Sequence, residues 1–257
     1  MDLNLLTERF RRDGYAAPID ILSPDQVARC RAQYDQLEAD RRARGITARP
    51  TQQHFVYKPF WDLATHPRVL EVMRAAIGPD LVLIATGFFS KSPGDCEKYV
   101  AWHQDTTYWG LEPLFAATLW IAMDDSDVAN GCLRVIPGSH HALLPHGKSG
   151  KTGNILGNNQ EIDPAFIDES KAVDLELKAG QASLHHGLTV HGSNPNRSDR
   201  RRCGMTVRFT TPDVTPVKGV FVDKPILVSG EDRYGHFEYL PAPDFAGTAH
   251  ASPSVGV

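Results

Sequence analysis

The pattern of hydrophobic and polar positions changes about a third of the way along the chain. In the first part, Ser23 stands where a helix N-cap is expected, a proline follows it, and Gln26 can close a capping box. Residues 24–44 are rich in Ala, Leu, Glu and Arg, which favour helix. A second helix is predicted over 66–77 and should end at Gly78.

From residue 81 onward the pattern is that of short strands. An apolar run at 81–86 is followed by further β-rich runs, and Gly, Pro and Asn separate them. Many short strands with turn signals predict a sandwich or a barrel. The Gly- and Asn-rich stretch 145–159 is predicted as a long loop, and loops of this size often cover functional sites. The further strand-like runs are 98–105, 116–124, 132–136, 182–186 and 203–210.

Composition narrows the class of protein. A length of 257 residues suits one large domain or a domain with helical extensions, and 41% hydrophobic residues suit an ordinary globular core. A net charge of -4 and a pI near 6.2 give no reason to expect nucleic acid as a partner. No apolar run approaches the roughly 20 residues of a membrane span, and the first residues lack the pattern of a signal peptide. Four scattered cysteines predict free thiols in a cytoplasmic protein.

The most informative chemistry is the pair His103 and Asp105. If residues 98–105 form a strand, both side chains leave the same face, while Val100 and Trp102 lie on the opposite face. A third ligand, His191, can arrive from a distant segment. Two histidines and one carboxylate form the facial triad that holds non-haem Fe(II) and leaves positions open for other ligands.

Three histidines compete for the third ligand position. His185 and His186 are adjacent, so they cannot both face inward from one strand. One is expected at the surface and the other as a hydrogen-bonded neighbour. His191 is preferred because it precedes Gly192-Ser193 and stands eleven residues before Arg202.

The segment after this histidine has an unusual pattern of arginines. In 203–210 every second residue is apolar, and the opposite face of the same strand carries Arg202 and Arg208. Arginines that face a barrel interior require anionic partners. The far carboxylate of 2-oxoglutarate is one such partner for Arg202. Arg208 is expected to pair with an internal acid or to touch substrate, and the internal pair is preferred.

Two further sequence features are not interpreted as binding sites. Gly150-Lys151-Thr152 resembles the end of a phosphate loop, but Pro145 stands where that motif needs glycine, so nucleotide binding there is rejected. A cluster of basic residues near the end of the first predicted helix is interpreted as a solvated helix terminus. Its members are Arg41, Arg42, Arg44 and Arg49.

The chain resembles the phytanoyl-CoA dioxygenase family from about Phe10 to Thr210. The resemblance depends on several short sequence motifs that occur in a fixed order, and together they are more specific than the triad alone. They are Trp102-His103-Gln104-Asp105 with Tyr108, Leu119-Trp120-Ile121-Ala122-Met123, Asn130-Gly131-Cys132-Leu133 leading into Ile136-Pro137-Gly138-Ser139-His140, and His191-Gly192-Ser193 with Arg202.

This resemblance implies a mainly β fold with N-terminal helices, in which the core is a double-stranded β-helix (jelly roll, cupin-like). A single domain is then expected over 1–257, with a helical part at about 1–80, a jelly-roll core at about 81–215 and a C-terminal extension at about 216–257.

The same resemblance implies site residues and cofactors. Fe(II) would be bound by His103, Asp105 and His191, and 2-oxoglutarate and O2 would be the cosubstrates. Ser193 and Arg202 look like the pair that holds the far carboxylate of 2-oxoglutarate. Further cosubstrate neighbours would be Trp120, Lys58 and Gln104, and orienting Asp105 is the alternative role for Gln104.

The predicted function is an Fe(II)- and 2-oxoglutarate-dependent dioxygenase that hydroxylates a small molecule. Related halogenases replace the metal carboxylate by Gly or Ala, so the presence of Asp105 favours hydroxylation. The same iron chemistry ending in desaturation, epimerisation or cyclisation, a non-catalytic jelly-roll binding protein, and a zinc hydrolase stay open as alternatives. Tyr108, Trp109, Asn154 and Arg208 are candidates for the substrate wall, with packing at the barrel rim as the alternative. The sequence predicts no oligomeric state.

Overall fold

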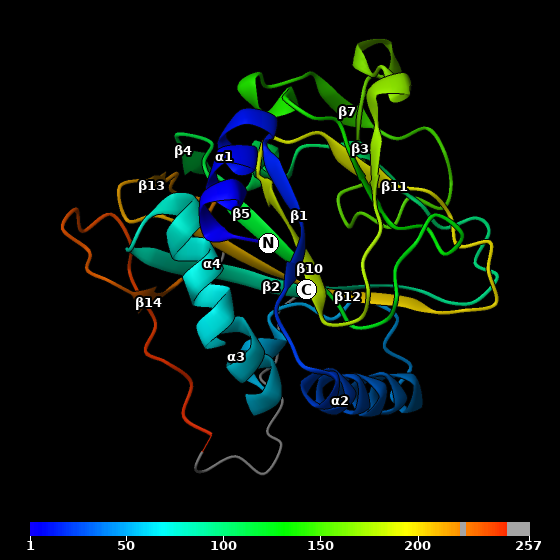
Figure 1. The fold of residues 1–257 in the computed structure, drawn as a ribbon, viewed down its shortest axis with the longest axis horizontal. Coiled ribbons are helices and arrows are strands. Elements are labelled where there is room, and N and C mark those ends of the chain that lie inside the picture. Colours follow the sequence, from blue (N-terminus) through cyan, green and yellow to red (C-terminus); the bar gives the residue numbers. More distant parts are fainter. Residues whose placement is uncertain (222–224, 246–257) are drawn as a thin grey trace.

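Two antiparallel sheets form the body of the protein in a computed structural model, which describes residues 1–221 and 225–245, apart from the side chain of Tyr108 (Figure 1). The fold is the predicted jelly roll. In spatial order, the six-stranded sheet contains β1 (Tyr15–Asp20), β10 (Gln181–His186), β5 (Ala117–Ala122), β12 (Arg202–Thr210), β2 (Leu81–Lys91) and β14 (Ile226–Ser229). The four-stranded sheet contains β3 (Val100–His103), β11 (His191–Ser193), β6 (Leu133–Val135) and β9 (Val173–Leu175).

Shorter elements complete the fold. Two small strand pairs and several 3-10 turns connect the main strands. The pairs are β4 (Leu111–Glu112) with β13 (Thr215–Pro216), and β7 (His146–Lys148) with β8 (Gln160–Ile162). The 3-10 turns are η1 (Gln53–Phe55), η2 (Asp105–Tyr108), η3 (Ser139–His141), η4 (Pro164–Phe166) and η5 (Glu169–Lys171).

Four α-helices belong to the N-terminal part. The two predicted helices are present, and the capping box between Ser23 and Gln26 forms as expected. The first helix was not predicted; it begins after Asp2, whose carboxylate accepts backbone hydrogen bonds, and ends at Gly14 with φ 79°. The helices are α1 (Leu3–Asp13), α2 (Pro24–Ala43), α3 (Lys58–Ala64) and α4 (Pro67–Ile77).

The main hydrophobic core lies between these helices and one face of the six-stranded sheet. On β12 the predicted alternation is confirmed, because Cys203, Met205, Val207 and Phe209 all belong to this core. The opposite face of β12 looks toward the four-stranded sheet. Polar side chains on that face therefore enter the space between the two sheets, where a pocket lies.

Some local predictions were wrong. β1 lies within the stretch at about 1–80 that was predicted as helical, and it forms an edge of the large sheet. The strand predicted over 98–105 ends at His103, and Asp105 begins the 3-10 turn η2. Val100 was expected opposite His103, yet both line the same pocket. The reason is the irregular register between β3 and β11, which interrupts the simple two-residue alternation.

The predicted loop 145–159 contributes to the wall of the protein near this pocket. Strands β7 and β8 form a hairpin at its two ends. Leu156, inside the loop, packs against Phe89 and Val100, which line the pocket. The C-terminal part also contributes to the large sheet, since β14 pairs with β2.

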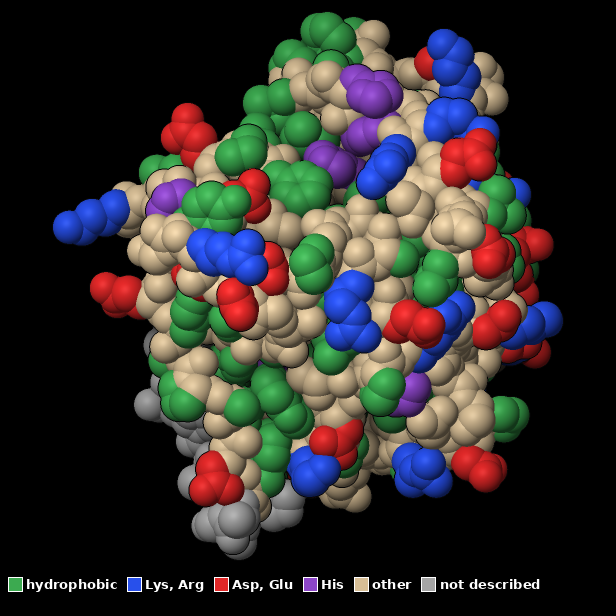
Figure 2. Space-filling model, turned by 60° about the vertical axis from the view of Figure 1, so that its left-hand side comes forward, with side chains coloured by type: hydrophobic (Ala, Val, Ile, Leu, Met, Phe, Trp, Pro, Cys, Tyr) green, Lys and Arg blue, Asp and Glu red, His purple; other side chains and the backbone are tan. Residues whose placement is uncertain are grey.

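The surface carries no strongly one-sided charge on the face shown in Figure 2, where acidic and basic side chains are interspersed. This agrees with the small net charge. Among the described residues, no helix has the length and apolar character needed to cross a membrane.

Candidate active site

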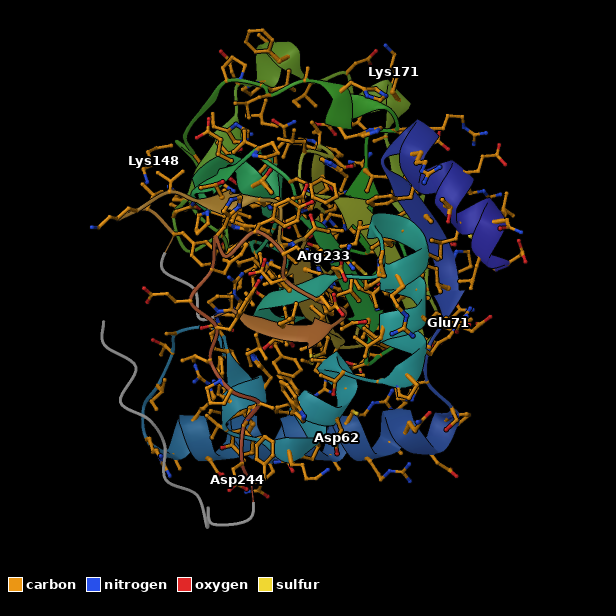
Figure 3. All side chains as sticks on the ribbon, turned by 90° about the vertical axis from the view of Figure 1, so that its left-hand side faces the viewer. Asp62, Glu71, Lys148, Lys171, Arg233 and Asp244 are labelled. Carbon is orange, nitrogen blue, oxygen red and sulfur yellow. The ribbon has the colours of Figure 1, made fainter. Side chains whose placement is uncertain are left out.

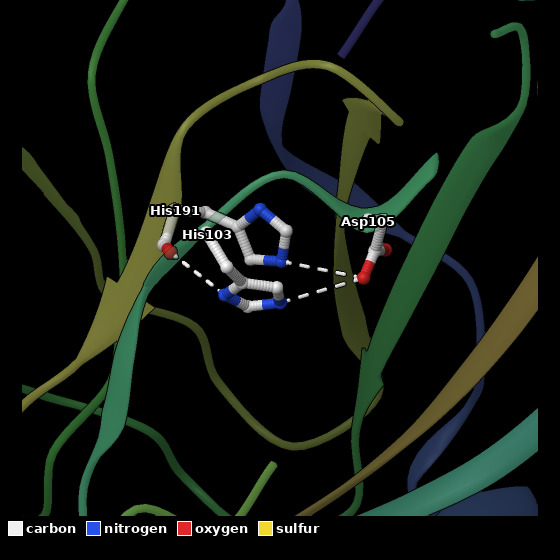
Figure 4. A group of neighbouring side chains, drawn as sticks. All are labelled: His103, Asp105 and His191. Atoms are coloured by element: carbon white, nitrogen blue, oxygen red, sulfur yellow. Dashed lines mark hydrogen bonds and ion pairs between the residues drawn. The ribbon is translucent and has the colours of Figure 1, made fainter. Parts of the chain in front are cut away.

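Asp105 stands at the centre of a cluster of buried polar side chains between the two sheets. One of its oxygens, Oδ1, lies 3.4 Å from Nε2 of His103 and 3.8 Å from Nε2 of His191 (Figure 4). The other oxygen, Oδ2, accepts a hydrogen bond of 2.9 Å from Thr118. Oδ1 therefore faces both imidazoles, while the hydrogen bond from Thr118 fixes the position of Oδ2.

The two imidazole rings are oriented by backbone carbonyls. Nδ1 of His103 lies 2.9 Å from the carbonyl of Ala101 and 3.1 Å from that of His191. Nδ1 of His191 lies 2.9 Å from the carbonyl of Thr189. A carbonyl only accepts, so each Nδ1 carries a proton, and each Nε2 is the ring nitrogen that faces Asp105 and would bind a metal in its deprotonated form. This outer support is typical of metal-binding histidines.

The residues present fit a divalent metal such as ferrous iron. One ligand atom from each of His103, Asp105 and His191 lies within 4.8 Å of the others, and all three side chains are buried. Burial alone would raise the pKa of Asp105, but hydrogen bonds to His103 and His185 hold that pKa well below its usual value. The cluster thus offers one carboxylate and two neutral nitrogens, which is the donor set of a facial triad.

The structure brings most of the predicted site residues to one pocket. Its free volume is about 30 Å³, which is room for about one water molecule. The predicted residues that line it are His103, Asp105, Trp120, His191, Ser193, Arg202 and Arg208.

At one end of this pocket lies a group of buried donors. Nη2 of Arg202 lies 3.3 Å from Oγ of Ser193. Lys91, which sequence reasoning missed, donates to the same Oγ at 2.6 Å and also to the carbonyl of Asn194. Burial lowers the pKa of Arg202 to about 10. Burial and the charge of Arg202 lower the pKa of Lys91 to about 6. A bound carboxylate would relieve this repulsion.

The hydroxyl of Ser193 has a defined orientation as a consequence. Its oxygen already accepts from Lys91 and Arg202, so both of its lone pairs are engaged. Its proton is then free to be donated to an acceptor in the pocket. Arg202 supplies positive charge, Ser193 supplies a neutral donor, and a bound anion would favour the charged form of Lys91, so the group suits a carboxylate.

Trp120 faces Arg202 across the pocket, with the guanidinium carbon 5.4 Å from the centre of its ring. This position requires a glycine at 204 on the neighbouring strand. A Cβ there would lie 2.1 Å from Cζ2 of Trp120, which is far inside contact distance. Gly204 therefore makes the room that the indole ring occupies.

Comparisons with known proteins identify the family. The profile of the phytanoyl-CoA dioxygenase (PhyH) family matches residues 10–204, which is most of the chain. The chain belongs to the phytanoyl-CoA dioxygenase family. This family comprises enzymes that depend on Fe(II) and 2-oxoglutarate, which agrees with the donor set of the pocket.

Individual relatives agree with this assignment. A homolog of phytanoyl-CoA dioxygenase domain-containing protein 1 from Dictyostelium discoideum is 35% identical over 118 residues, which cover 43% of this chain and 40% of that protein. A Stutzerimonas stutzeri protein, the probable alpha-ketoglutarate-dependent hypophosphite dioxygenase, is 26% identical over 176 residues, which cover 68% and 60% of the two chains. The chain spans about half the length of these curated relatives. The solved apo structure of the non-heme monooxygenase ThoJ is 33% identical with a TM-score of 0.80, and the match covers 93% of this chain and 88% of that one.

Within this phytanoyl-CoA dioxygenase fold, Lys58 does not occupy the position that was predicted for it. It lies on α3 with its side chain 62% exposed, and its Nζ is paired with Asp62 at 2.6 Å. Figure 3 labels Asp62 on this helix. The structure does not support the prediction of Lys58 as a cosubstrate neighbour, because this exposed side chain is not among the residues that line the pocket.

Gln104 and Asn154 are also turned away from the pocket. The amide of Gln104 donates to the carbonyls of Ala142 and Leu188, both at 2.7 Å, and accepts from the backbone of Leu144. Gln104 therefore links two loops beside the site by hydrogen bonds, and it is not among the residues that line the pocket. Asn154 accepts from the backbone of Ala101 and donates to the carbonyl of Gln160. These hydrogen bonds give both side chains structural roles, which for Asn154 agrees with the alternative of packing at the barrel rim. Contacts with cosubstrate or substrate stay predictions for both residues.

The remaining substrate-wall candidates give a mixed result. The side chain of Tyr108 lies outside the described residues. Trp109 packs with Leu111 and Ala116 and does not line the pocket, but its ring lies 5.1 Å from the guanidinium carbon of Arg208. Arg208 lines the pocket, with Nε 3.9 Å from Oδ2 of Asp105. An internal acid is thus near it, as preferred, but Nε makes no hydrogen bond, and the role of Arg208 stays a prediction.

His185 and His186 point in opposite directions, as their adjacency required. His186 packs beside Phe10 and Phe115 outside the pocket. His185 is buried in the pocket, with Nε2 3.5 Å from Oδ2 of Asp105. One of the two was expected at the surface, but His185 is buried and His186 is partly buried. His185 is a neighbour of the metal carboxylate that sequence reasoning did not place.

The members of the basic cluster near the end of α2 differ in their exposure to solvent. Arg42 and Arg44 are exposed, as expected for a solvated helix terminus. Arg49 is different, because its Nε and Nη1 atoms are buried. The prediction was wrong for this residue: Arg49 lies well past the helix end, and its guanidinium carbon stacks 3.9 Å from the ring centre of Phe89.

Proposed function

We propose that the protein is an Fe(II)- and 2-oxoglutarate-dependent dioxygenase that hydroxylates an unactivated C–H bond of a small molecule and releases succinate and CO2. The observation that carries this proposal is that one oxygen of Asp105 lies within 3.8 Å of the Nε2 atoms of both His103 and His191. A ferrous ion with 2-oxoglutarate and O2 would supply the oxidation, and the protein would position and shield the reactants.

In this proposal the residues of the chain have separate tasks. His103, Asp105 and His191 hold the metal. Arg202 and Ser193 bind the far carboxylate of 2-oxoglutarate, which fixes the orientation of the cosubstrate before reaction. The face of Trp120 closes this part of the pocket and excludes water.

The outcome of the oxidation is the finer part of the proposal. Asp105 supplies a third protein ligand, which favours hydroxylation over halogenation. Desaturation, epimerisation and cyclisation use the same site residues and differ in where the substrate lies. A non-catalytic binding protein would have no need for both the buried triad and Arg202. A zinc hydrolase would leave Arg202 and Ser193 without a common ligand.

The test is a panel of candidate small molecules screened for substrate-stimulated succinate formation. We expect succinate only when iron, 2-oxoglutarate and O2 are all present, together with a product that has gained one oxygen atom by mass spectrometry. Succinate with a product of unchanged oxygen content would point to one of the other oxidative outcomes. Turnover with zinc in the absence of O2 would contradict the oxygenase.

A further prediction concerns Lys91. Replacing Lys91 by methionine should raise the 2-oxoglutarate concentration needed for half-maximal activity by about 10-fold or more, because a charge-assisted hydrogen bond contributes roughly 1.5–3 kcal/mol. The rate at saturating 2-oxoglutarate should change little. The matched control is Lys58→Met, which removes an exposed lysine and should leave this requirement unchanged. An unchanged requirement in Lys91→Met would remove Lys91 from the carboxylate site.

A further inference from the structure

Arg49 is held against the wall of the metal pocket by the residues that follow it. The carbonyl of Pro50 accepts a 3.0 Å hydrogen bond from the backbone of Phe88, and the backbone of Gln52 donates to Thr86 at 2.8 Å. These bonds attach the segment to β2 like a short additional strand. They place the guanidinium of Arg49 over Phe89, whose ring also lines the metal pocket.

Arg208, which lies on β12, extends its side chain toward the region of β2 where Arg49 lies. A Cβ on Gly87 would lie 3.7 Å from Nη1 of Arg208 and 3.8 Å from the carbonyl of Pro50. The end of the Arg208 side chain is therefore close to the backbone beside Arg49. Burial, and next the positive charge of Arg208, lower the pKa of Arg49 to about 10, while Asp105 acts in the opposite direction.

Neither guanidinium has its full set of partners. In the described part of the chain, Nε and Nη1 of Arg49 and Nε of Arg208 are buried without a hydrogen bond. The nearest carboxylate oxygen to Arg208 belongs to Asp105, 3.9 Å away, and Asp105 is already committed to the metal site. Buried guanidinium groups without partners destabilise a protein, so their presence calls for a ligand that satisfies them.

The charges around the pocket lead to the same conclusion. Among the residues that line it, Arg202 and Arg208 are cationic and Asp105 is the one carboxylate. Lys91 is bonded to the pocket residue Ser193, and Arg49 stacks on Phe89. A ferrous ion together with dianionic 2-oxoglutarate would add no net charge. An excess of positive charge would therefore remain for a further anion.

A groove of about 540 Å³ lies outside this wall and shares Phe89 with the metal pocket. Arg49 lines the groove, and exposed Arg42 lies on its rim. Other cations of the groove have acidic partners in ion pairs: Arg41 with Glu38, Lys98 with Asp95, and Arg201 with Asp35 and Asp124. The uncompensated positive charge therefore lies where groove and pocket meet, which favours the approach of an anion.

We propose that Arg49 and Arg208 bind an oxyanion of the substrate, a carboxylate or a phosphate, and that the substrate reaches the metal from this groove. The inference rests on the proposed function, because it assigns the rest of the pocket to iron and 2-oxoglutarate. It narrows the substrate class to small organic anions. Arg202, Ser193 and Lys91 would take the far carboxylate of the cosubstrate, so Arg49 and Arg208 serve a different ligand.

The test uses the full chain loaded with Mn(II), a redox-silent substitute, and saturating 2-oxoglutarate. Binding of 2-oxoglutarate is measured first by calorimetry, and benzoate, phenyl phosphate and neutral benzamide are then titrated. In the wild type, at least one of the two anions should bind about 10-fold more tightly than benzamide. Whichever anion shows the larger preference identifies the oxyanion.

Arg49→Gln should bring the anions to within about twofold of benzamide, while 2-oxoglutarate still binds as in the wild type. The matched control, Arg29→Gln, removes an exposed arginine on α2 and should keep the preference. Since Arg49 has buried atoms without partners, its replacement should leave the melting temperature unchanged or higher. A loss of binding with an unchanged melting temperature is therefore not a folding defect.

Two results would overturn the inference. In one, benzoate, phenyl phosphate and benzamide bind the wild type equally. In the other, Arg49→Gln weakens 2-oxoglutarate binding and leaves the probes unaffected, which would assign Arg49 to the cosubstrate. Failure of the proposed function is visible separately, as absence of 2-oxoglutarate binding to the metal-loaded wild type. In that case, an anion preference that depends on Arg49 would support an anion site at this residue, but not its assignment to a dioxygenase substrate.

Discussion

Asp105→Ala is expected to abolish succinate formation and to weaken metal binding by more than about 100-fold. Outer partners of metal ligands already contribute roughly 10- to 100-fold in affinity, and Asp105 would be a ligand itself. Its Oδ1 atom is the one carboxylate oxygen that faces both His103 and His191. Metal affinity measured by calorimetry and succinate measured by chromatography should therefore fall together.

Controls separate this effect from a loss of folding. Asp105→Asn keeps a side chain that can accept from Thr118, yet lacks the negative charge of the carboxylate and so should bind the metal less tightly and lose most activity. Asp62→Ala removes an exposed acid on α3 and should behave as the wild type. Thermal melting without metal should show all three proteins folded. Full hydroxylase activity in Asp105→Ala would contradict the assignment of this carboxylate to the metal.

Arg202→Gln is expected to raise the half-saturating 2-oxoglutarate concentration by at least about 30-fold. Truncating one partner of a buried, hydrogen-bonded charge pair costs about 2–5 kcal/mol, and each 1.4 kcal/mol corresponds to a factor of about ten. Arg202 is buried beside Ser193 and Lys91, where water cannot replace its charge. The concentration of iron required should change much less, because Arg202 is not among the metal-binding group.

The neighbouring arginine provides a matched control for this variant. Arg200 lies two residues away, is paired with Asp127 and is 47% exposed, so Arg200→Gln should keep the wild-type 2-oxoglutarate requirement. Arg202→Lys should recover only part of the loss, since an ammonium cannot reproduce the two-pronged geometry of guanidinium. A larger change in the iron requirement than in the 2-oxoglutarate requirement would show that Arg202 acts on the metal site.

The sequence predicted those features that depend on local pattern. The capping box at Ser23 and the alternation along β12 were visible as residue types at fixed spacing. The pocket placement of Arg202 and Arg208 followed from the same alternation, because a strand sends successive side chains to opposite faces. The short sequence motifs around His103 and His191 were specific enough to indicate the family, and the family profile confirms it.

Other features depend on contacts between distant segments, and no local pattern reports these. Lys91 and Ser193 come from separate strands that meet only in the folded barrel. Lys91 carried one usable signal, a lysine at the end of a long buried strand, but the strand was predicted to stop at residue 86. Lys58 resembled a cosubstrate neighbour in the sequence, yet its pairing with Asp62 on α3 turns it to solvent.

The sequence by itself determined the type of chemistry, because the donor atoms for a metal and the alternation of a strand are properties of residue types and spacing. Only the tertiary structure decided which oxygen of Asp105 faces the imidazoles, and that two nitrogens of Arg49 are buried in the region that the end of Arg208 also reaches. Burial and the pairing of charges depend on which segments pack together. A basic residue that is solvated in one fold is an unpartnered cation in another, and the chain order alone does not distinguish the two.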